Sequence, residues 1–236
     1  MNGEYICLPC SDGRSFQAYL ARPANGPAPG IVLIQEIFGV NAQMREVADD
    51  LAAKGFLVIA PDLFWRAQPA IQLDPSSEQD RTKAMSLLQQ LDVALAVNDC
   101  ISAMDYLRAL PASNGKVGAL GYCLGGKLAY LMATRSNVDA SVGYYGIGLQ
   151  ELLGEATSIG KPLMLHIAGN DHLCQPPARE AIIKGLSGLP VPVAIHVYPE
   201  AGHAFARRRS AAYHEASAQA ADARTLEFLS RNLSAG

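Results

Sequence analysis

Apolar positions along the chain repeatedly change period, from short continuous runs to a helical spacing and back. Residues 31–34, Ile-Val-Leu-Ile, form an uninterrupted apolar run after Gly30, which is typical of a strand buried on both faces. Segment 42–54 carries apolar residues at helical spacing and is followed by Gly55, a residue type that commonly ends a helix. The same alternation then predicts strands at 56–60, 116–121, 140–144, 162–167 and 193–198, and helices at 78–110 (in two pieces), 124–134, 178–186 and 210–233.

Strands that alternate with helices indicate βαβ units, so the predicted class is α/β with a mainly parallel central sheet flanked by helices. Two early segments, 4–8 and 15–21, are separated by Ser11-Asp12-Gly13 and instead predict an N-terminal antiparallel hairpin. No internal repeat or low-complexity linker divides the chain. Because open α/β folds of roughly 200–250 residues are commonly one domain, we expect a single domain over residues 1–236.

The composition and charge of the chain indicate a folded protein and give no sign of nucleic-acid or membrane binding. Half of the residues are hydrophobic and 17% are charged, which suits a packed core, and the net charge of −3 gives no reason to expect nucleic acid or an anionic membrane as a partner. The chain begins without a basic segment followed by an apolar one, and it contains no apolar stretch long enough to span a membrane. We therefore expect a cytoplasmic protein.

The five cysteines are an odd number without a disulfide-rich pattern, which fits a reducing compartment. Cys7 and Cys10 form a C-x-x-C pair, but no second pair completes a zinc site, so a structural role is the simpler interpretation. No other cluster has metal-ligand spacing, and we expect no metal. His166 and His196 fall inside predicted strands, where packing is the simpler expectation.

The segment Gly121-Tyr122-Cys123-Leu124-Gly125 joins a predicted strand to a predicted helix. Its G-x-C-x-G spacing is that of the nucleophile elbow of α/β-hydrolases, with cysteine in place of serine. The glycines relieve steric crowding in a strained tight turn, and the helix N-terminus favours a thiolate and a developing oxyanion. A dinucleotide-binding loop requires a different glycine spacing and is excluded, whereas a buried structural cysteine remains the alternative.

An elbow predicts an acid and then a histidine, each after a strand end. Asp171 follows the predicted strand 162–167, and His203 follows the predicted strand 193–198. These strand ends belong to the same sheet edge as Cys123. His203 is expected to exchange protons with the sulfur and the leaving group, and Asp171 to fix its tautomer. A helix-capping Asp and an ordinary loop His are the alternatives.

A second carboxylate, Glu36, comes shortly after the apolar run 31–34. In this fold the loop after that strand supplies one N–H of the oxyanion hole, and the residue after the nucleophile supplies the other. We therefore assign the oxyanion hole to the backbone N–H groups of Ile37 and Leu124. A carboxylate here is costly to bury unless it is paired, so Glu36 is either functional or a salt-bridged or surface residue.

Five motifs, in this order along almost the whole chain, resemble the dienelactone hydrolase (carboxymethylenebutenolidase) family: EIFGVN, GYCLGG, GYYG, GND and AGHAFAR. The resemblance implies a monomeric α/β-hydrolase that uses a Cys–His–Asp triad and no cofactor. It gives those roles to Cys123, His203 and Asp171. It also implies that Glu36 takes the proton of the cysteine when substrate binds.

By the same resemblance, Arg81 and Arg207 bind the carboxylate of the substrate. An arginine holds the acid until the substrate carboxylate competes for it, and Glu36 is then free to deprotonate Cys123. Bidentate, charge-assisted Arg–carboxylate pairing makes this competition physically reasonable. Taken singly, both arginines would be interpreted as solvated surface charges.

The sequence departs from the typical family pattern around the pocket. Met85 and Leu88 stand where bulky aromatic residues are typical, and Ala204 stands where a serine is typical. Phe38, Tyr144 and Tyr145 are expected to line the site, with core packing the alternative for Phe38. These departures leave the reaction class unchanged but leave the preferred substrate open.

The sequence therefore predicts a hydrolase that opens an unsaturated, carboxylated lactone, 4-carboxymethylenebut-2-en-4-olide, to maleylacetate through a thioester on Cys123. The first alternative is an ester or thioester hydrolase of broader specificity on the same scaffold. A non-catalytic ligand-binding protein is the second, but it predicts a broken triad. We expect a small-molecule substrate and a monomer, with a dimer left open.

Overall fold

The computed structural model describes residues 3–10 and 12–234 of the chain. It forms two compact units, one over the described residues up to Gly118 and the other from Ala119 to Ser234. The boundary falls within strand β5 (Ser113–Tyr122). The single-domain expectation stays a prediction, and the two units are described in turn.

The first unit contains four strands and three helices besides the beginning of β5. They are β1 (Glu4–Pro9), β2 (Ser15–Ala21), β3 (Ala28–Ile34), α1 (Ala42–Ala53), β4 (Leu57–Pro61), α2 (Glu78–Gln90) and α3 (Val93–Ala109). β1 pairs with β2, and β2 with β4, in antiparallel fashion, whereas β3 and β4 are parallel. The predicted N-terminal hairpin is confirmed, although Ser11 in its turn lies outside the described residues.

Side-chain caps explain where the helices of this unit begin. Asn41 accepts the Met44 N–H at the start of α1, and Ser77 accepts the Asp80 N–H at the start of α2. Asp92 accepts two N–H groups at the start of α3, which is why the long helical segment 78–110 is divided into two helices as predicted. Local capping therefore fixes the break between α2 and α3.

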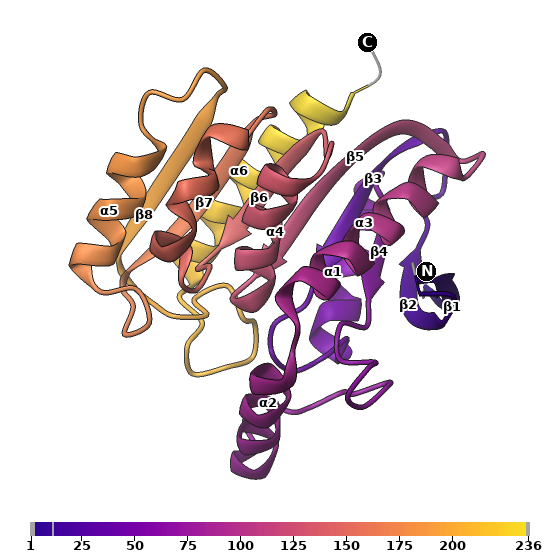
Figure 1. Ribbon diagram of the computed structural model, residues 1–236, viewed down its shortest axis with the longest axis horizontal. Coiled ribbons are helices and arrows are strands. Elements are labelled where there is room, and N and C mark those ends of the chain that lie inside the picture. The colour runs from indigo at the N-terminus through magenta and orange to yellow at the C-terminus, as the bar shows by residue number, and fades with distance from the viewer. Residues whose placement is uncertain (1–2, 11, 235–236) are drawn as a thin grey trace. The chain divides into compact units, whose positions relative to one another are not determined.

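The second unit contains three parallel strands after the end of β5: β6 (Ala140–Tyr144), β7 (Leu163–Asn170) and β8 (Val193–Gly202). Its helices are α4 (Leu124–Arg135), α5 (Pro176–Leu186) and α6 (Glu215–Leu233), together with a 3₁₀ helix, η1 (Leu149–Ser158), that the sequence pattern did not predict. Figure 1 shows α6 behind β6 and β7, on the side opposite α4. β6 and most of β7 are buried and mainly apolar, as expected of strands covered on both faces, whereas β8 is only partly buried.

The prediction of a helix from residue 210 is wrong for residues 210–214. α6 begins at Glu215, and His214 is its N-cap, with its side chain accepting the Ser217 N–H. The backbone N–H of His214 donates to the Phe205 carbonyl at 2.9 Å, which ties the preceding residues into the loop after β8. This tertiary hydrogen bond overrides the local helical pattern.

The strand pairings and the alternating helices confirm the predicted α/β class, with a mainly parallel sheet and an antiparallel N-terminal hairpin. Within the part of the chain that the structure describes, no helix combines the length and apolar character needed to cross a membrane.

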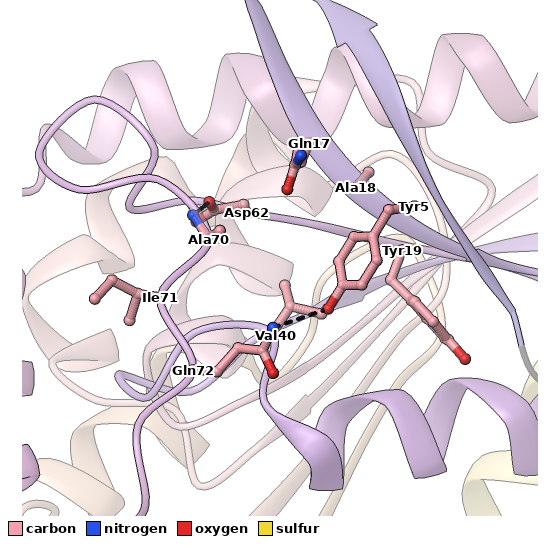
Figure 2. Close-up of a pocket in the computed structure, with 9 residues that line it drawn as sticks. All are labelled: Tyr5, Gln17, Ala18, Tyr19, Val40, Asp62, Ala70, Ile71 and Gln72. Atoms are coloured by element: carbon pink, nitrogen blue, oxygen red, sulfur yellow. Dashed lines mark hydrogen bonds between the residues drawn. The ribbon is translucent and has the colours of Figure 1, made fainter.

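A small hollow in the first unit lies between β2 and the loop after β4 (Figure 2). The buried carboxylate of Asp62 accepts the N–H of Phe64 at 3.0 Å and that of Ala70 at 2.7 Å, and burial raises its pKa. Across the hollow, Tyr5 Oη accepts a hydrogen bond from Gln72 Nε2 at 3.2 Å. The volume is about 10 Å³, room for one water molecule and too little for a lactone.

Candidate active site

Cys123 lies between the end of β5 and the first residue of α4, as the elbow motif predicts. Its backbone has φ 56° and ψ −112°, a strained conformation for a residue with a side chain. The Cys123 N–H donates to the Tyr144 carbonyl at 3.0 Å, and its own carbonyl accepts the Lys127 N–H at 3.1 Å. A Cβ atom on Gly121 would lie 1.9 Å from the Gly125 carbonyl oxygen, so the turn requires glycine there.

His203 and Asp171 meet Cys123 in this unit. His203 Nε2 lies 3.1 Å from Cys123 Sγ, and His203 Nδ1 lies 2.8 Å from Asp171 Oδ2. Asp171 directly follows β7, and His203 directly follows β8, so parallel pairing of these strands brings both residues to one sheet edge. The structure thus brings together the three residues that the sequence singled out.

Burial and hydrogen bonding constrain this trio. Cys123 and Asp171 are each 5% exposed, and the His203 side chain is 11% exposed. The second oxygen of Asp171, Oδ1, accepts the Leu173 N–H at 2.8 Å, which fixes the carboxylate plane. A thiol, an imidazole and a carboxylate linked in this way can pass a proton between sulfur and Nε2 while the carboxylate holds the Nδ1–H tautomer.

Tyr145 borders the histidine. Its ring lies 5.1 Å from the His203 ring, centroid to centroid, in an edge-to-face arrangement, and it also contacts Phe205. Tyr145 is buried and has a positive φ of 37°, and its N–H donates to the His166 carbonyl at 2.7 Å. The Tyr145 side chain therefore packs directly against the His203 imidazole.

Leu124 is the first residue of α4, so its N–H belongs to the turn that has no carbonyl partner within the helix. Arg207 is partly exposed and lies four residues after His203, in the loop before α6, where its N–H donates to the Ala204 carbonyl. Ala204, with φ 64°, is almost fully buried. These three positions all belong to the second unit.

The remaining predicted site residues belong to the first unit. Glu36 and Phe38 are each 4% exposed and Ile37 is partly exposed, in the loop that follows β3. Arg81 is exposed on the first turn of α2 and donates to the carbonyls of Pro75 and Ser76. Burial excludes the surface alternative for Glu36, whereas Arg81 lies at a surface position.

The sequence interpretation missed Gln35, which is fully buried beside Glu36. Its side-chain amide donates to the Glu36 carbonyl at 3.2 Å, and its side-chain oxygen accepts the Leu63 N–H at 3.1 Å. Gln35 thus fixes the backbone that presents Glu36 and Ile37. A polar residue at the end of an apolar strand was the available signal.

The five cysteines all lie within the described residues, and none of them forms a disulfide there. Cys7 is exposed and Cys10 is buried, where its sulfur contacts Asp99 and Arg66, so the C-x-x-C pair is not a disulfide. Over residues 3–10 and 12–234, no group of three or more His, Cys, Asp or Glu side chains is arranged to hold a metal ion.

Comparison with known proteins gives one consistent family. The model of the dienelactone hydrolase family matches residues 16–233. A carboxymethylenebutenolidase from Pseudomonas putida is 44% identical over 226 residues, 96% of this chain and 95% of the relative. Carboxymethylenebutenolidase 1 from Cupriavidus pinatubonensis is 42% identical and covers 97% of each chain.

Solved structures with a similar fold include proteins described as dienelactone hydrolases. A Klebsiella pneumoniae structure has a TM-score of 0.86 at 28% identity and covers 97% of this chain and 98% of its own. The dienelactone hydrolase from Anabaena variabilis has a TM-score of 0.71 at 20% identity, covers 99% of this chain and 100% of its own, and supports the fold alone.

Proposed function

Because the chain belongs to the dienelactone hydrolase family, we propose that it hydrolyses a carboxylated unsaturated lactone, 4-carboxymethylenebut-2-en-4-olide, to maleylacetate. The observation that carries the proposal is the linked trio of Cys123 Sγ, the His203 imidazole and the Asp171 carboxylate, at 3.1 and 2.8 Å. The names of the relatives at 42–44% identity, carboxymethylenebutenolidase, support the choice of substrate. The protein would act on this small molecule as a cytoplasmic monomer without a cofactor.

In the first half-reaction, the Cys123 thiolate attacks the lactone carbonyl carbon and forms a C–S bond. The carbonyl oxygen becomes an oxyanion, for which the Leu124 N–H at the start of α4 is a suitable donor. Collapse of this intermediate breaks the ring C–O bond and leaves a thioester. The released enolate oxygen takes a proton, and the resulting enol tautomerises to the ketone of the product.

In the second half-reaction, His203 accepts a proton from water, whose oxygen attacks the thioester carbonyl. Collapse breaks the C–S bond, releases the new carboxylate and returns Cys123 to its starting state. Asp171, held by the Leu173 N–H, keeps Nδ1 protonated so that Nε2 is the basic nitrogen facing the sulfur.

The family resemblance assigns the roles in the first unit. We propose that Glu36, a buried carboxylate, accepts the thiol proton when substrate binds, and that the Ile37 N–H is the second oxyanion donor. Arg81 and Arg207 would bind the substrate carboxylate, while Phe38 and Tyr145 would contact the ring. These assignments make the reaction depend on a carboxylate in the substrate.

The experiment compares the lactone acid with its methyl ester on purified protein. We expect the acid to have a kcat/KM about 10- to 100-fold higher, the range of one or two charge-assisted hydrogen bonds. Replacing Arg81 or Arg207 by alanine should shrink this preference. Arg22→Ala, which removes an exposed arginine paired with Glu4, is the matched control and should leave the preference unchanged.

The proposed nucleophile is tested separately, because Cys123→Ala should lose turnover of the lactone. Full turnover of the lactone by a folded Cys123→Ala protein would contradict the proposed nucleophile. Equal kcat/KM for acid and ester in the wild-type protein would contradict the role of the arginines while leaving the thioester mechanism intact.

A second candidate function is a broader ester or thioester hydrolase. Met85 on α2 is 48% exposed, and Leu88 is partly exposed on the same helix, where the family typically has bulky aromatics. Flexible aliphatic side chains accept more shapes than an aromatic wall. Faster hydrolysis of simple aryl esters and acyl thioesters than of the lactone acid would favour this second function.

A further inference from the structure

A group of buried polar side chains links α6 to the three parallel strands of the second unit. Tyr144 is on β6, His166 on β7, Tyr198 on β8 and Thr225 on α6, and all four are at most 6% exposed. His166 Nδ1 lies 2.9 Å from Tyr198 Oη, and His166 Nε2 lies 2.9 Å from Thr225 Oγ1. Thr225 Oγ1 lies 2.7 Å from Tyr144 Oη.

Charged groups at the two ends of this series of hydrogen bonds fix which atom is the donor in each bond. At one end, Arg224 donates to Tyr198 Oη at 3.0 Å. A guanidinium cannot accept, so the Tyr198 hydroxyl keeps its own hydrogen to donate to His166 Nδ1. At the other end, Tyr144 Oη donates to Asp222 Oδ1 at 3.1 Å, because a carboxylate only accepts.

The donors of the two remaining hydrogen bonds, Thr225–Tyr144 and His166–Thr225, follow from these two. The Tyr144 hydrogen is used on Asp222, so Tyr144 Oη accepts the hydroxyl hydrogen of Thr225. Thr225 Oγ1 in turn accepts from His166 Nε2, which must carry the proton. Each hydroxyl and the imidazole therefore donate one hydrogen bond. The series of hydrogen bonds runs from the Arg224 guanidinium to the Asp222 carboxylate.

The backbone joins this chain to the candidate active site. The His166 carbonyl accepts the Tyr145 N–H at 2.7 Å, and the Tyr144 carbonyl accepts the Cys123 N–H at 3.0 Å. The Tyr145 ring packs edge-on against His203. A shift of the Tyr144–Tyr145 peptide would thus displace both the Cys123 sulfur and the His203 imidazole.

We propose that His166 is a positioning residue that, as a neutral imidazole protonated on Nε2, holds the Tyr144–Tyr145 peptide and through it Cys123 and His203. The proposal rests on the proposed function for its effect on turnover, but the tautomer is independent of the reaction. Figure 1 shows α6 behind β6 and β7, and the hydroxyl of Thr225 on this helix lies within hydrogen-bond distance of Tyr144 on β6 and of His166 on β7.

The surroundings favour the neutral form. His166 is packed between Tyr144 and His196, with ring centroids at 4.4 and 5.6 Å, and Arg224 and Asp222 are the charged groups that bond to the ends of the chain. Burial, with smaller contributions from His196 and Arg224, lowers the pKa of His166 to about 3. The imidazole therefore stays neutral at the pH at which the protein would work.

The first test measures the tautomer by ¹⁵N NMR of the histidine side chains, with His166→Gln used to assign the resonance. We expect Nδ1 to appear as an unprotonated nitrogen and Nε2 as a protonated one, unchanged between pH 5 and 8. A proton on Nδ1, or titration of His166 within this range, would overturn the proposal whatever the reaction is.

The second test uses Thr225→Val, which removes the hydroxyl but keeps the shape, and Thr225→Ser, which keeps the hydroxyl. For Thr225→Val we expect kcat to fall about tenfold with KM nearly unchanged, as for a displacement of well under 1 Å at the reacting groups. The serine variant should retain most of the wild-type kcat. Tyr198→Phe, which removes the donor to Nδ1, should resemble Thr225→Val.

A readout without lactone separates this proposal from the proposed function. Peptide-resolved alkylation of Cys123 by iodoacetamide, with exposed Cys7 as internal reference, reports on the site directly. We expect the pH profile of Cys123 alkylation to change in Thr225→Val and to return in Thr225→Ser. Wild-type kcat and alkylation profile in folded Thr225→Val and Tyr198→Phe proteins would show that the network only stabilises the fold, and would refute the positioning role.

Discussion

Gly121, two residues before Cys123, has no space for a side chain. A Cβ atom built there lies 1.9 Å from the Gly125 carbonyl oxygen and 2.2 Å from its carbonyl carbon. Both contacts are with backbone atoms in the first turn of α4, so no side-chain rotation can relieve them. Ordinary contact begins at 3.4 Å, so in Gly121→Ala the end of β5 and the start of α4 must separate by about 1.5 Å.

That displacement falls on the residues to which we assign the chemistry. Cys123 lies between the two segments that separate, and His203 is only 3.1 Å from its sulfur. Because a misplacement of about 1 Å at reacting groups can cost about 100-fold in rate, we expect kcat for the lactone acid to fall at least about 100-fold. This corresponds to about 2.7 kcal/mol of lost transition-state stabilisation.

The assay is steady-state hydrolysis of the lactone acid, followed by the change in its ultraviolet absorbance, on protein whose fold is checked by circular dichroism. Gly154→Ala is the matched control, because a Cβ atom there meets nothing within 4 Å and its φ is not positive. We expect its kcat to stay within about twofold of wild type. A Gly121→Ala protein with near-wild-type kcat would refute the elbow argument.

Three further predictions concern other side chains of the structure. Asp171→Asn, which cannot accept the Nδ1–H in the same way, should lower kcat by about 10³- to 10⁴-fold in the lactone assay, and a loss below tenfold would contradict its role. Asp99→Ala leaves the Arg66 guanidinium without its buried partner and should lower the free energy of unfolding by about 3 kcal/mol in urea titrations, whereas Asp12→Ala, at an exposed pair, should change it little. Burial lowers the pKa of His166 from 6.5 to about 3, so the unfolded chain binds a proton that the folded protein does not, and stability is lost as pH falls below 6.5. Between pH 7.5 and 5.0 the wild-type free energy of unfolding should therefore drop about 2 kcal/mol more than that of His166→Gln, and equal drops would contradict a neutral buried imidazole.

Local patterns in the sequence were sufficient to predict most of the fold. Continuous apolar runs marked the strands, because parallel strands covered on both faces carry no polar alternation. The sequence predicted two helical pieces over residues 78–110, and the structure gives the reason, because the Asp92 side chain caps the start of α3. The start of α6 was wrong because the hydrogen bond between His214 and Phe205 is a tertiary contact that no local pattern encodes.

The trio of Cys123, Asp171 and His203 could be predicted because each residue follows a strand, and parallel strands end at one edge. The bonds around His166 could not, since its partners Tyr198 and Thr225 lie 32 and 59 residues away in sequence. A buried histidine in a strand indicates packing, but its tautomer depends on partners that only the three-dimensional arrangement identifies. The roles of all the predicted site residues, in catalysis, in the oxyanion hole and in substrate binding, stay predictions.

If Cys123 is the nucleophile, it must form a covalent thioester with the substrate. Rapid acid quench during turnover of the lactone acid, followed by proteolysis and mass spectrometry, measures this directly. We expect the peptide containing Cys123 to gain the mass of one lactone, whereas Cys7 and Cys10 should remain unmodified. The adduct should accumulate when deacylation is slowed in Asp171→Asn. Turnover without any adduct on Cys123, at every quench time and in both proteins, would contradict the proposed nucleophile.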